Sequence, residues 1–253
     1  MGFDLEAVRI TALPEDAFYI SDFITEDEEN WLLQKVKSAP LPRWTQLSHR
    51  RLQTWPSALT KSNALLASPL PAWLRSPIVE PRFEALRIFN DAPHQAPNHV
   101  LVNEYQPGQG IMPHEDGAAY YPLVATVSLG APIVLDVYDK HTQSDRGSGT
   151  QIKAGRDVAG MLERNQRPQY RVLQERRSLL ITRGKMYTDL LHGIEGTTRD
   201  EDLGPDSISN WELLREKEPY QSGWYERKTR TSLTYRDVLQ VVKMGNTLKF
   251  LGR

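Results

Sequence analysis

Six short runs of β-favouring residues constrain the fold of this chain more than any other feature. Glycines and prolines separate these runs, which cover residues 99–105, 124–129, 133–138, 170–173, 178–182 and 230–238. Short strands with turn residues between them are typical of β-sandwiches and barrels. A chain of 253 residues is long enough to bury a sizeable core of this kind. We therefore expect a mainly β core that follows an N-terminal α/β extension.

A helix is predicted within the extension. Thr25 is followed three residues later by Glu28, which is the spacing of a capping box, and the helix should run to about Lys37. Leu32 and Val36 would then face the core, because residues four apart lie on the same side of a helix.

The stretch from Asn30 to Val79 contains no Asp or Glu, although the composition of the chain predicts about six in that length. Cations that contact phosphates and rings that stack on bases are what a single-stranded or flipped-base nucleic acid requires. The alternative is that the Trp residues anchor the core and the cations solvate a loop. The basic and aromatic residues are Lys35, Lys37, Arg43, Arg50, Arg51, Lys61 and Arg75, with Trp31, Trp44, Trp55 and Trp73.

The formal net charge of −1 at first argues against a protein that coats nucleic acid, since such binding needs an excess of Lys and Arg. This net charge averages two regions of opposite charge, however. An insertion at residues 195–229 has eight acidic and three basic residues up to position 219. Its negative charge offsets the positive charge of the basic stretch. Near-neutrality therefore argues only against indiscriminate binding. A second polar insertion covers residues 139–168 and predicts a surface loop.

The chain has no cysteine, which excludes disulfide scaffolds, iron–sulfur proteins and thiol nucleophiles. Any bound metal must take nitrogen or oxygen ligands from the six His and the carboxylates. With no secretion signal and no run of 18 apolar residues, we expect no membrane association and a location in the cytoplasm and nucleus.

His114 and Asp116 form the first candidate metal pair. Two residues apart on an extended segment, their side chains project to the same side and can share one ion. His192, in an apolar run before Gly193, is the best third ligand, although a satisfied core histidine is the alternative. Two His and one carboxylate suit iron(II) and leave positions open for oxygen and a chelating cosubstrate.

An alternating strand places Arg230, Ser232, Thr234 and Arg236 on one face. If that face is interior, an anion must be expected there, because a buried unpaired guanidinium is very costly. Two arginines suit a dicarboxylate, to which each can make forked charge-assisted bonds. The alternative is an exterior face that pairs with the acidic insertion.

Asn103 and Tyr105 share a face of an earlier strand and would give neutral hydrogen bonds to the same anion. Taken together, these motifs resemble those of the AlkB family of iron(II)- and 2-oxoglutarate-dependent dioxygenases over nearly the whole chain. The residues that carry the resemblance are Asn103, Tyr105, Gly108, His114, Asp116, His192, Arg230, Ser232, Thr234 and Arg236.

The resemblance implies a double-stranded β-helix core (a jelly roll, cupin-like) at residues 98–253, after an N-terminal extension at 1–97 that carries a nucleotide-recognition-type lid. It implies Fe(II), 2-oxoglutarate and O2 as cofactor and cosubstrates. The iron ligands would be His114, Asp116 and His192, and the cosubstrate residues Asn103, Tyr105, Arg230, Ser232 and Arg236. The substrate residues would be Trp44, Arg50, Arg51, Gln53, Trp55, Tyr120 and Tyr121.

The function implied is oxidative demethylation of alkylated nucleic acid, single-stranded or with a flipped base, through an iron(IV)-oxo hydroxylation by a monomeric enzyme. One alternative is a nucleic-acid-binding module with weak or lost turnover. Another is a hydroxylase or demethylase of protein side chains. Thr54, Trp55 and Pro56 stand where relatives that repair DNA have Tyr-Gly after the lid glutamine, and Ser232 stands where several have Asn, which leaves the substrate open.

Overall fold

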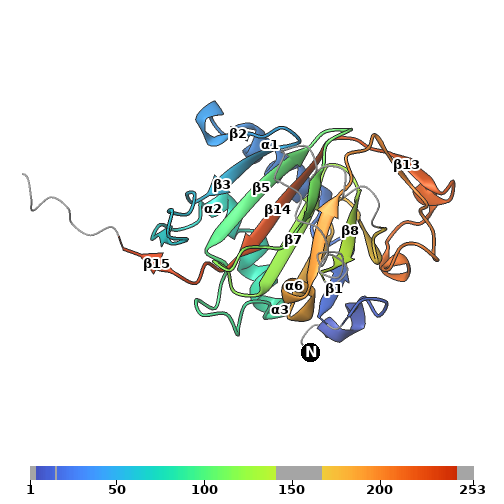
Figure 1. Ribbon diagram of the computed structural model, residues 1–253. Coiled ribbons are helices and arrows are strands. Elements are labelled where there is room, and N and C mark those ends of the chain that lie inside the picture. The colour runs from blue at the N-terminus through green and yellow to red at the C-terminus, as the bar shows by residue number, and fades with distance from the viewer. Residues whose placement is uncertain (1–3, 15, 141–166, 244–253) are drawn as a thin grey trace, which may run out of the picture.

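Two antiparallel sheets make up the core of the protein in the computed structural model, which describes residues 4–14, 16–140 and 167–243 (Figure 1). The larger sheet has seven strands in the order β1-β10-β7-β14-β5-β3-β2, and the smaller has four in the order β6-β11-β8-β9. The larger sheet consists of β1 (Ala17–Ile20), β2 (Thr45–Gln46), β3 (Arg51–Trp55), β5 (His99–Tyr105), β7 (Leu123–Leu129), β10 (Leu179–Arg183) and β14 (Arg230–Arg236). The smaller consists of β6 (Ile111–His114), β8 (Ile133–Asp139), β9 (Tyr170–Gln174) and β11 (Leu190–Ile194).

Shorter elements lie around the two sheets. Two further strand pairs are β12 (Arg199–Glu201) with β13 (Trp224–Glu226), and β4 (Leu65–Leu66) with β15 (Val241–Val242). The helices are α1 (Glu26–Lys37), α2 (Ala72–Arg75), α3 (Glu84–Leu86) and α6 (Lys185–Thr188), with the helical turns η1 (Leu5–Val8), η2 (Leu41–Arg43), η3 (Ile78–Phe83), η4 (Trp211–Leu213) and η5 (Glu218–Tyr220). No helix in the described ranges is long and apolar enough to cross a bilayer.

All six β-rich runs form strands of these two sheets, so the prediction of a mainly β jelly-roll core is confirmed. The helix prediction is also confirmed. Glu28 N–H donates to Thr25 Oγ1 at 3.2 Å and Thr25 N–H donates to Glu28 Oε2 at 2.8 Å, which is a reciprocal capping box. Leu32 and Val36 are buried, as the four-residue spacing predicts.

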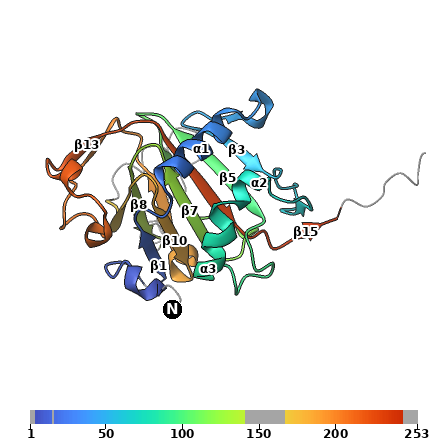
Figure 2. The same ribbon diagram turned by 180° about the vertical axis from the view of Figure 1, so that it is seen from behind.

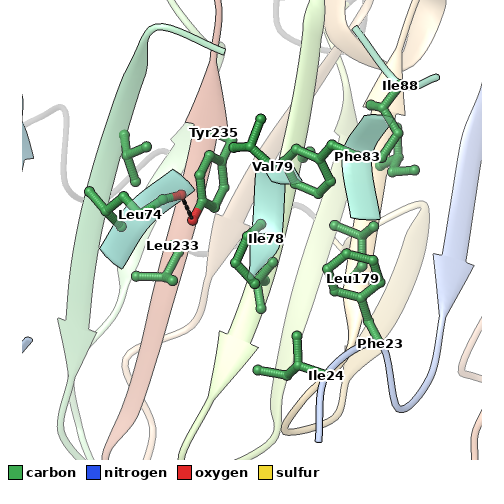
Figure 3. Close-up of a cluster of buried hydrophobic side chains, with 14 of the residues drawn as sticks. Phe23, Ile24, Leu74, Ile78, Val79, Phe83, Ile88, Leu179, Leu233 and Tyr235 are labelled. Atoms are coloured by element: carbon green, nitrogen blue, oxygen red, sulfur yellow. Dashed lines mark hydrogen bonds between the residues drawn. The ribbon is translucent and has the colours of Figure 1, made fainter. Parts of the chain in front are cut away.

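The main hydrophobic core lies behind the larger sheet. Figure 2 shows α1, α2 and α3 across this face of the sheet, and Figure 3 shows the side chains between the helices and the strands. Leu233 and Tyr235 of β14 point into this core, and Tyr235 Oη donates to Leu74 O at 2.9 Å (Figure 3). Because alternate residues of a strand face opposite sides, the other side chains of β14 point to the front of the sheet, toward the smaller sheet.

The N-terminal segment takes part in the larger sheet directly. β1 pairs with β10 at one edge, and β3 pairs with β5 near the other. Figure 1 shows these segments at opposite sides of the sheet. The extension and the strands that follow it are therefore built into one sheet, with β2 as the edge strand.

A buried ion pair joins the two ends of the acidic insertion. Arg227 donates to Asp200 through two nitrogens, at 2.9 and 2.7 Å, and both side chains are buried. Forked pairs of this kind are the stronger class of charged hydrogen bond. Residues 141–166 of the other insertion lie outside the described part of the chain.

One buried carboxylate joins α1 to two loops of the core, and its removal should cost measurable stability. Glu29 Oε1 accepts from Gly130 N–H at 2.7 Å, and Glu29 Oε2 accepts from Arg176 Nε at 2.9 Å. We expect Glu29→Ala to lower the free energy of unfolding by about 2–3 kcal/mol, because a buried N–H loses its charged acceptor. Urea denaturation measures the change.

Glu26→Ala is the matched control on the same helix. Glu26 is largely exposed and pairs with Arg176 and Arg177 at the surface. Its loss should cost less than about 1 kcal/mol, as is usual for exposed ion pairs. Equal losses for the two variants would contradict the structural role given to Glu29.

Candidate metal centre and anion pocket

A cavity of about 440 Å³ lies between the two sheets. Its walls come from β5, β7, β10 and β14 of the larger sheet and from β6, β8 and β11 of the smaller. This volume lies within the range of roughly 300–1,000 Å³ that is usual for small-molecule sites. The polar faces of β5 and β14 therefore open onto a space that can hold a ligand.

His114, Asp116 and His192 meet at this cavity, and the geometry of the strands explains why. His114 on β6 and His192 on β11 are paired residues of adjacent antiparallel strands, and their ring centroids are 4.4 Å apart. Gly193 permits the close approach, since a Cβ there would lie 3.0 Å from Ile111 O. The candidate ligand atoms of the three side chains all lie within 4.8 Å of one another.

Both histidines are prepared to bind a cation. His114 Nδ1–H donates to Met112 O at 2.9 Å, which leaves Nε2 as the free lone pair. Burial lowers the pKa of His192 to about 4, opposed by the charge of Asp116, so its imidazole is neutral at pH 7 as a metal ligand must be. The second oxygen of Asp116 remains available, since Arg236 Nη2 donates to Oδ1.

The donor set fits iron(II). Two imidazole nitrogens and one carboxylate oxygen match the ligand set of non-haem iron sites and leave open positions for other ligands. Within the described ranges, no other group of three or more His, Cys, Asp or Glu side chains has ligand atoms this close together.

The loop that carries Asp116 is held by the segment after β14. Asp237 is fully buried and accepts from His94 N–H at 3.1 Å, His94 Nδ1 at 2.6 Å and Asn98 Nδ2 at 2.8 Å. Its backbone oxygen accepts from Tyr121 N–H at 2.8 Å. These hydrogen bonds fix Asp237 relative to the segments that carry His94, Asn98 and Tyr121. Asp116 is therefore anchored from the end of the same strand that carries Arg236.

Arg230 is the most unusual charge in the cavity. Its side chain is only 2% exposed, and it donates through Nη2 to Ser128 Oγ at 2.8 Å and to Gln174 Oε1 at 3.0 Å. Its Nε has no partner, and no carboxylate of the described residues pairs with it. Burial lowers the pKa of Arg230 to about 10, which still leaves it cationic at pH 7. An anion bound in the cavity would supply the missing partner.

Asn103 and Tyr105 line the cavity beside Arg230, as the strand pattern predicts. Burial raises the pKa of Tyr105, against the opposing charge of Arg230, so its hydroxyl stays protonated and can donate a hydrogen bond. Ser232 and Arg236 line the same space. Together with the orphaned Nε of Arg230, these donors fit a dicarboxylate such as 2-oxoglutarate.

The expected substrate residues divide between the two faces of the larger sheet. Arg50 and Tyr120 line the cavity. The other five do not line this cavity, and their contact with a substrate stays a prediction. Trp44, Trp55 and Tyr121 pack against the core behind the sheet, Arg51 pairs with Glu104, and Gln53 is buried.

Gln53 shows why these side chains lie away from the cavity. It lies opposite Val102 in the pairing of β3 with β5, and Val102 faces the helix-covered core. Gln53 Nε2 donates to Val36 O at 2.9 Å, and Gln53 Oε1 accepts from Trp55 Nε1 at 2.9 Å. The nitrogen and the oxygen of the side-chain amide therefore both have partners. Alternation along β3 then turns Arg51 and Trp55 to the same face. Gln53, Arg51 and Trp55 therefore lie on the helix-covered face of the sheet.

Several residues that shape the cavity carry no clear signal in the sequence. Gln174 and Ser128 hold Arg230, and Leu59 and Asn63 line the cavity from the basic stretch. Gln174 is the last residue of β9, directly after Val172 and Leu173, which is a weak signal of a buried polar role. Its meeting with Arg230 depends on how the two sheets face each other, and no local pattern encodes that.

The chain is similar to known proteins over most of its length. The sequence profile of the 2OG-Fe(II) oxygenase superfamily matches residues 16–236. A protein of Danio rerio named "Probable RNA/DNA demethylase ALKBH6" is 38% identical over 250 residues, which cover 99% of this chain and 96% of that protein. A Xenopus tropicalis protein named "tRNA (carboxymethyluridine(34)-5-O)-methyltransferase alkbh8" is 29% identical over 92% of this chain and 33% of its own length.

Among solved structures, OsALKBH1 aligns with 17% identity and a TM-score of 0.49, covering 89% of this chain and 99% of its own. A Pseudomonas putida prolyl-4-hydroxylase aligns with 12% identity and a TM-score of 0.49, covering 92% of this chain and 99% of its own.

We expect the removal of two neighbouring carboxylates to have very different effects on metal affinity. Asp116→Ala should weaken Mn(II) binding, measured by calorimetry, by more than the about 10–100-fold typical for loss of an outer partner, because one of three ligands is lost. Glu115→Ala should leave binding nearly unchanged, since Glu115 is exposed and pairs with Lys140. Equal affinities for Asp116→Ala and the wild type would contradict the site.

Proposed function

The chain belongs to the 2OG-Fe(II) oxygenase superfamily, and we propose that its substrate is alkylated nucleic acid, which it demethylates oxidatively. It is an iron(II)- and 2-oxoglutarate-dependent dioxygenase, in keeping with the match of the profile to most of the chain. The observation that carries the oxidative chemistry is that one cavity holds both a His-Asp-His set and a buried guanidinium without an anionic partner among the described residues.

Three side chains hold the iron, and two groups of side chains orient the cosubstrate. His114, Asp116 and His192 bind the metal. Bound iron(II), with 2-oxoglutarate and O2, supplies the chemistry that yields succinate and carbon dioxide and inserts one oxygen atom into a C–H bond of the substrate. On an N-methyl group this gives an N-hydroxymethyl group, which releases formaldehyde and leaves the amine.

The protein contributes by holding the cosubstrate in one orientation. Arg230 binds the distal carboxylate, and Asn103 and Tyr105 donate hydrogen bonds to it. Arg236 and Ser232 lie near the end that meets the metal. Because these groups are fixed by packing before the ligand arrives, little reorganisation is needed on binding.

The basic stretch supports a nucleic-acid substrate. Leu59 and Asn63 from this stretch line the cavity, and Tyr120 adds an aromatic face. A phosphate backbone lying along the stretch would place an extruded base at the cavity. The Danio rerio relative is itself named a probable RNA/DNA demethylase.

We expect the protein to release formaldehyde and succinate in equal amounts from single-stranded DNA or RNA that carries N-methylated bases. Unmethylated strands of the same sequence should give only slow, uncoupled succinate. The double variant His114→Ala, Asp116→Ala should give neither product above background, because the metal is lost. Coupled formaldehyde and succinate assays measure both.

Two other outcomes would overturn the substrate and point elsewhere. Tight, salt-sensitive binding of oligonucleotides that persists in the double variant, with no product from the wild type, would indicate a binding module. Coupled product from methylated peptides but not from oligonucleotides would indicate a protein substrate.

A further inference from the structure

Arg50 lies at the end of the cavity where the cosubstrate would bind. It belongs to the hairpin of β2 and β3, which was expected to contact the substrate. Its Nε donates to Asn103 Oδ1 at 3.3 Å, and its side chain lines the cavity. Burial raises the pKa of Tyr105, and the charges of Arg230 and Arg50 both oppose that rise. Arg50 therefore lies beside the two neutral donors that we assign to the distal carboxylate.

The neighbouring arginine points the other way. Arg51 forms a forked ion pair with Glu104, at 2.7 and 3.0 Å, and its guanidinium lies 4.1 Å from the ring of Trp44 behind the sheet. Arg50, in contrast, has no ion pair with any carboxylate of the described residues. One of two adjacent cations is thus neutralised in the structure, while the other faces the cavity beside Asn103.

We propose that Arg50 is a binding residue of the 2-oxoglutarate site. Its bond to Oδ1 fixes the amide of Asn103, so that Nδ2 is the group left to donate to an anion. Its charge adds to that of Arg230 at the end of the cavity where the distal carboxylate binds. The inference rests on cosubstrate binding alone and does not depend on which substrate is demethylated.

The position of Arg50 also connects the cosubstrate to the hairpin. Arg50 O accepts from Leu47 N–H at 2.9 Å, which closes the turn between β2 and β3. His49 O accepts from Gly110 N–H at 3.2 Å, which joins the turn to the residue before β6. A cosubstrate that contacts Arg50 would therefore also hold the hairpin in place.

Equilibrium binding of 2-oxoglutarate to the Mn(II) protein, without nucleic acid, tests the proposal by calorimetry. Arg50→Gln should raise the Kd by about tenfold or more, since a charge-assisted bond is lost. Arg43→Gln is the charge-matched control: Arg43 lies on the same stretch but stacks on Trp55 and donates to Pro56 O. The Kd of Arg43→Gln for 2-oxoglutarate should equal that of the wild type.

A second ligand shows which carboxylate is involved. 2-Oxobutyrate keeps the metal-chelating end and lacks the distal carboxylate. Its Kd should be the same for wild type and Arg50→Gln. If Arg50→Gln unfolds, as judged by its melting temperature, Arg50→Lys replaces it and should also bind 2-oxoglutarate more weakly than the wild type.

The proposal is overturned if the Arg50 variants bind 2-oxoglutarate as the wild type does, or if Arg43→Gln weakens binding equally. A loss of oligonucleotide affinity with unchanged 2-oxoglutarate affinity also overturns it, because Arg50 would then contact the substrate. Cleavage by chymotrypsin after Leu47 gives a second readout. 2-Oxoglutarate should slow this cleavage in the wild type and not in Arg50→Gln, and equal protection would contradict the link to the hairpin.

Discussion

The buried guanidinium of Arg230 sets the conditions that the rest of this site has to meet. Arg227, three residues earlier, is also buried, but its charge is matched by Asp200. Arg230 has only neutral partners among the described residues, Ser128 and Gln174. A buried charge without a counter-charge is costly, and its retention is understandable if a ligand anion completes the site. The metal ligands, the neutral donors and Arg50 are all arranged around the space where that anion would lie.

Strand β14 can carry this charge because its two faces differ. Leu233 and Tyr235 pack into the helix-covered core behind the larger sheet (Figure 3), and β5 and β7 pair with the strand on either side. Dense packing on one face therefore fixes the direction of Arg230 and Arg236 on the other. The same strand continues into Asp237, which holds the loop of Asp116. Anion site and metal site thus share one rigid support.

Local patterns predicted much of this structure, and they failed where long-range pairing decides. The capping box at Thr25 and the spacing of His114 from Asp116 are local, and both predictions agree with the geometry. The alternation of Arg230 and Arg236 was also visible, but only the facing sheet shows that their side is interior. For β3 the pattern was insufficient: Gln53 faces the core because β3 pairs with β5 in one register. A single-residue shift of that register would have turned the opposite set of side chains to the cavity.

The contact between Arg230 and the distal carboxylate of the cosubstrate is the one on which the proposed site depends most. Anaerobic titration of the iron(II) protein with 2-oxoglutarate and with 2-oxobutyrate, followed by the visible absorption of the chelated 2-oxo acid, measures this directly. The wild type should prefer 2-oxoglutarate by about 100-fold or more, and Arg230→Met should lose most of that preference, because the buried charge pair is gone. Equal affinity of the wild type for the two acids, or an undiminished preference in Arg230→Met, would contradict the account.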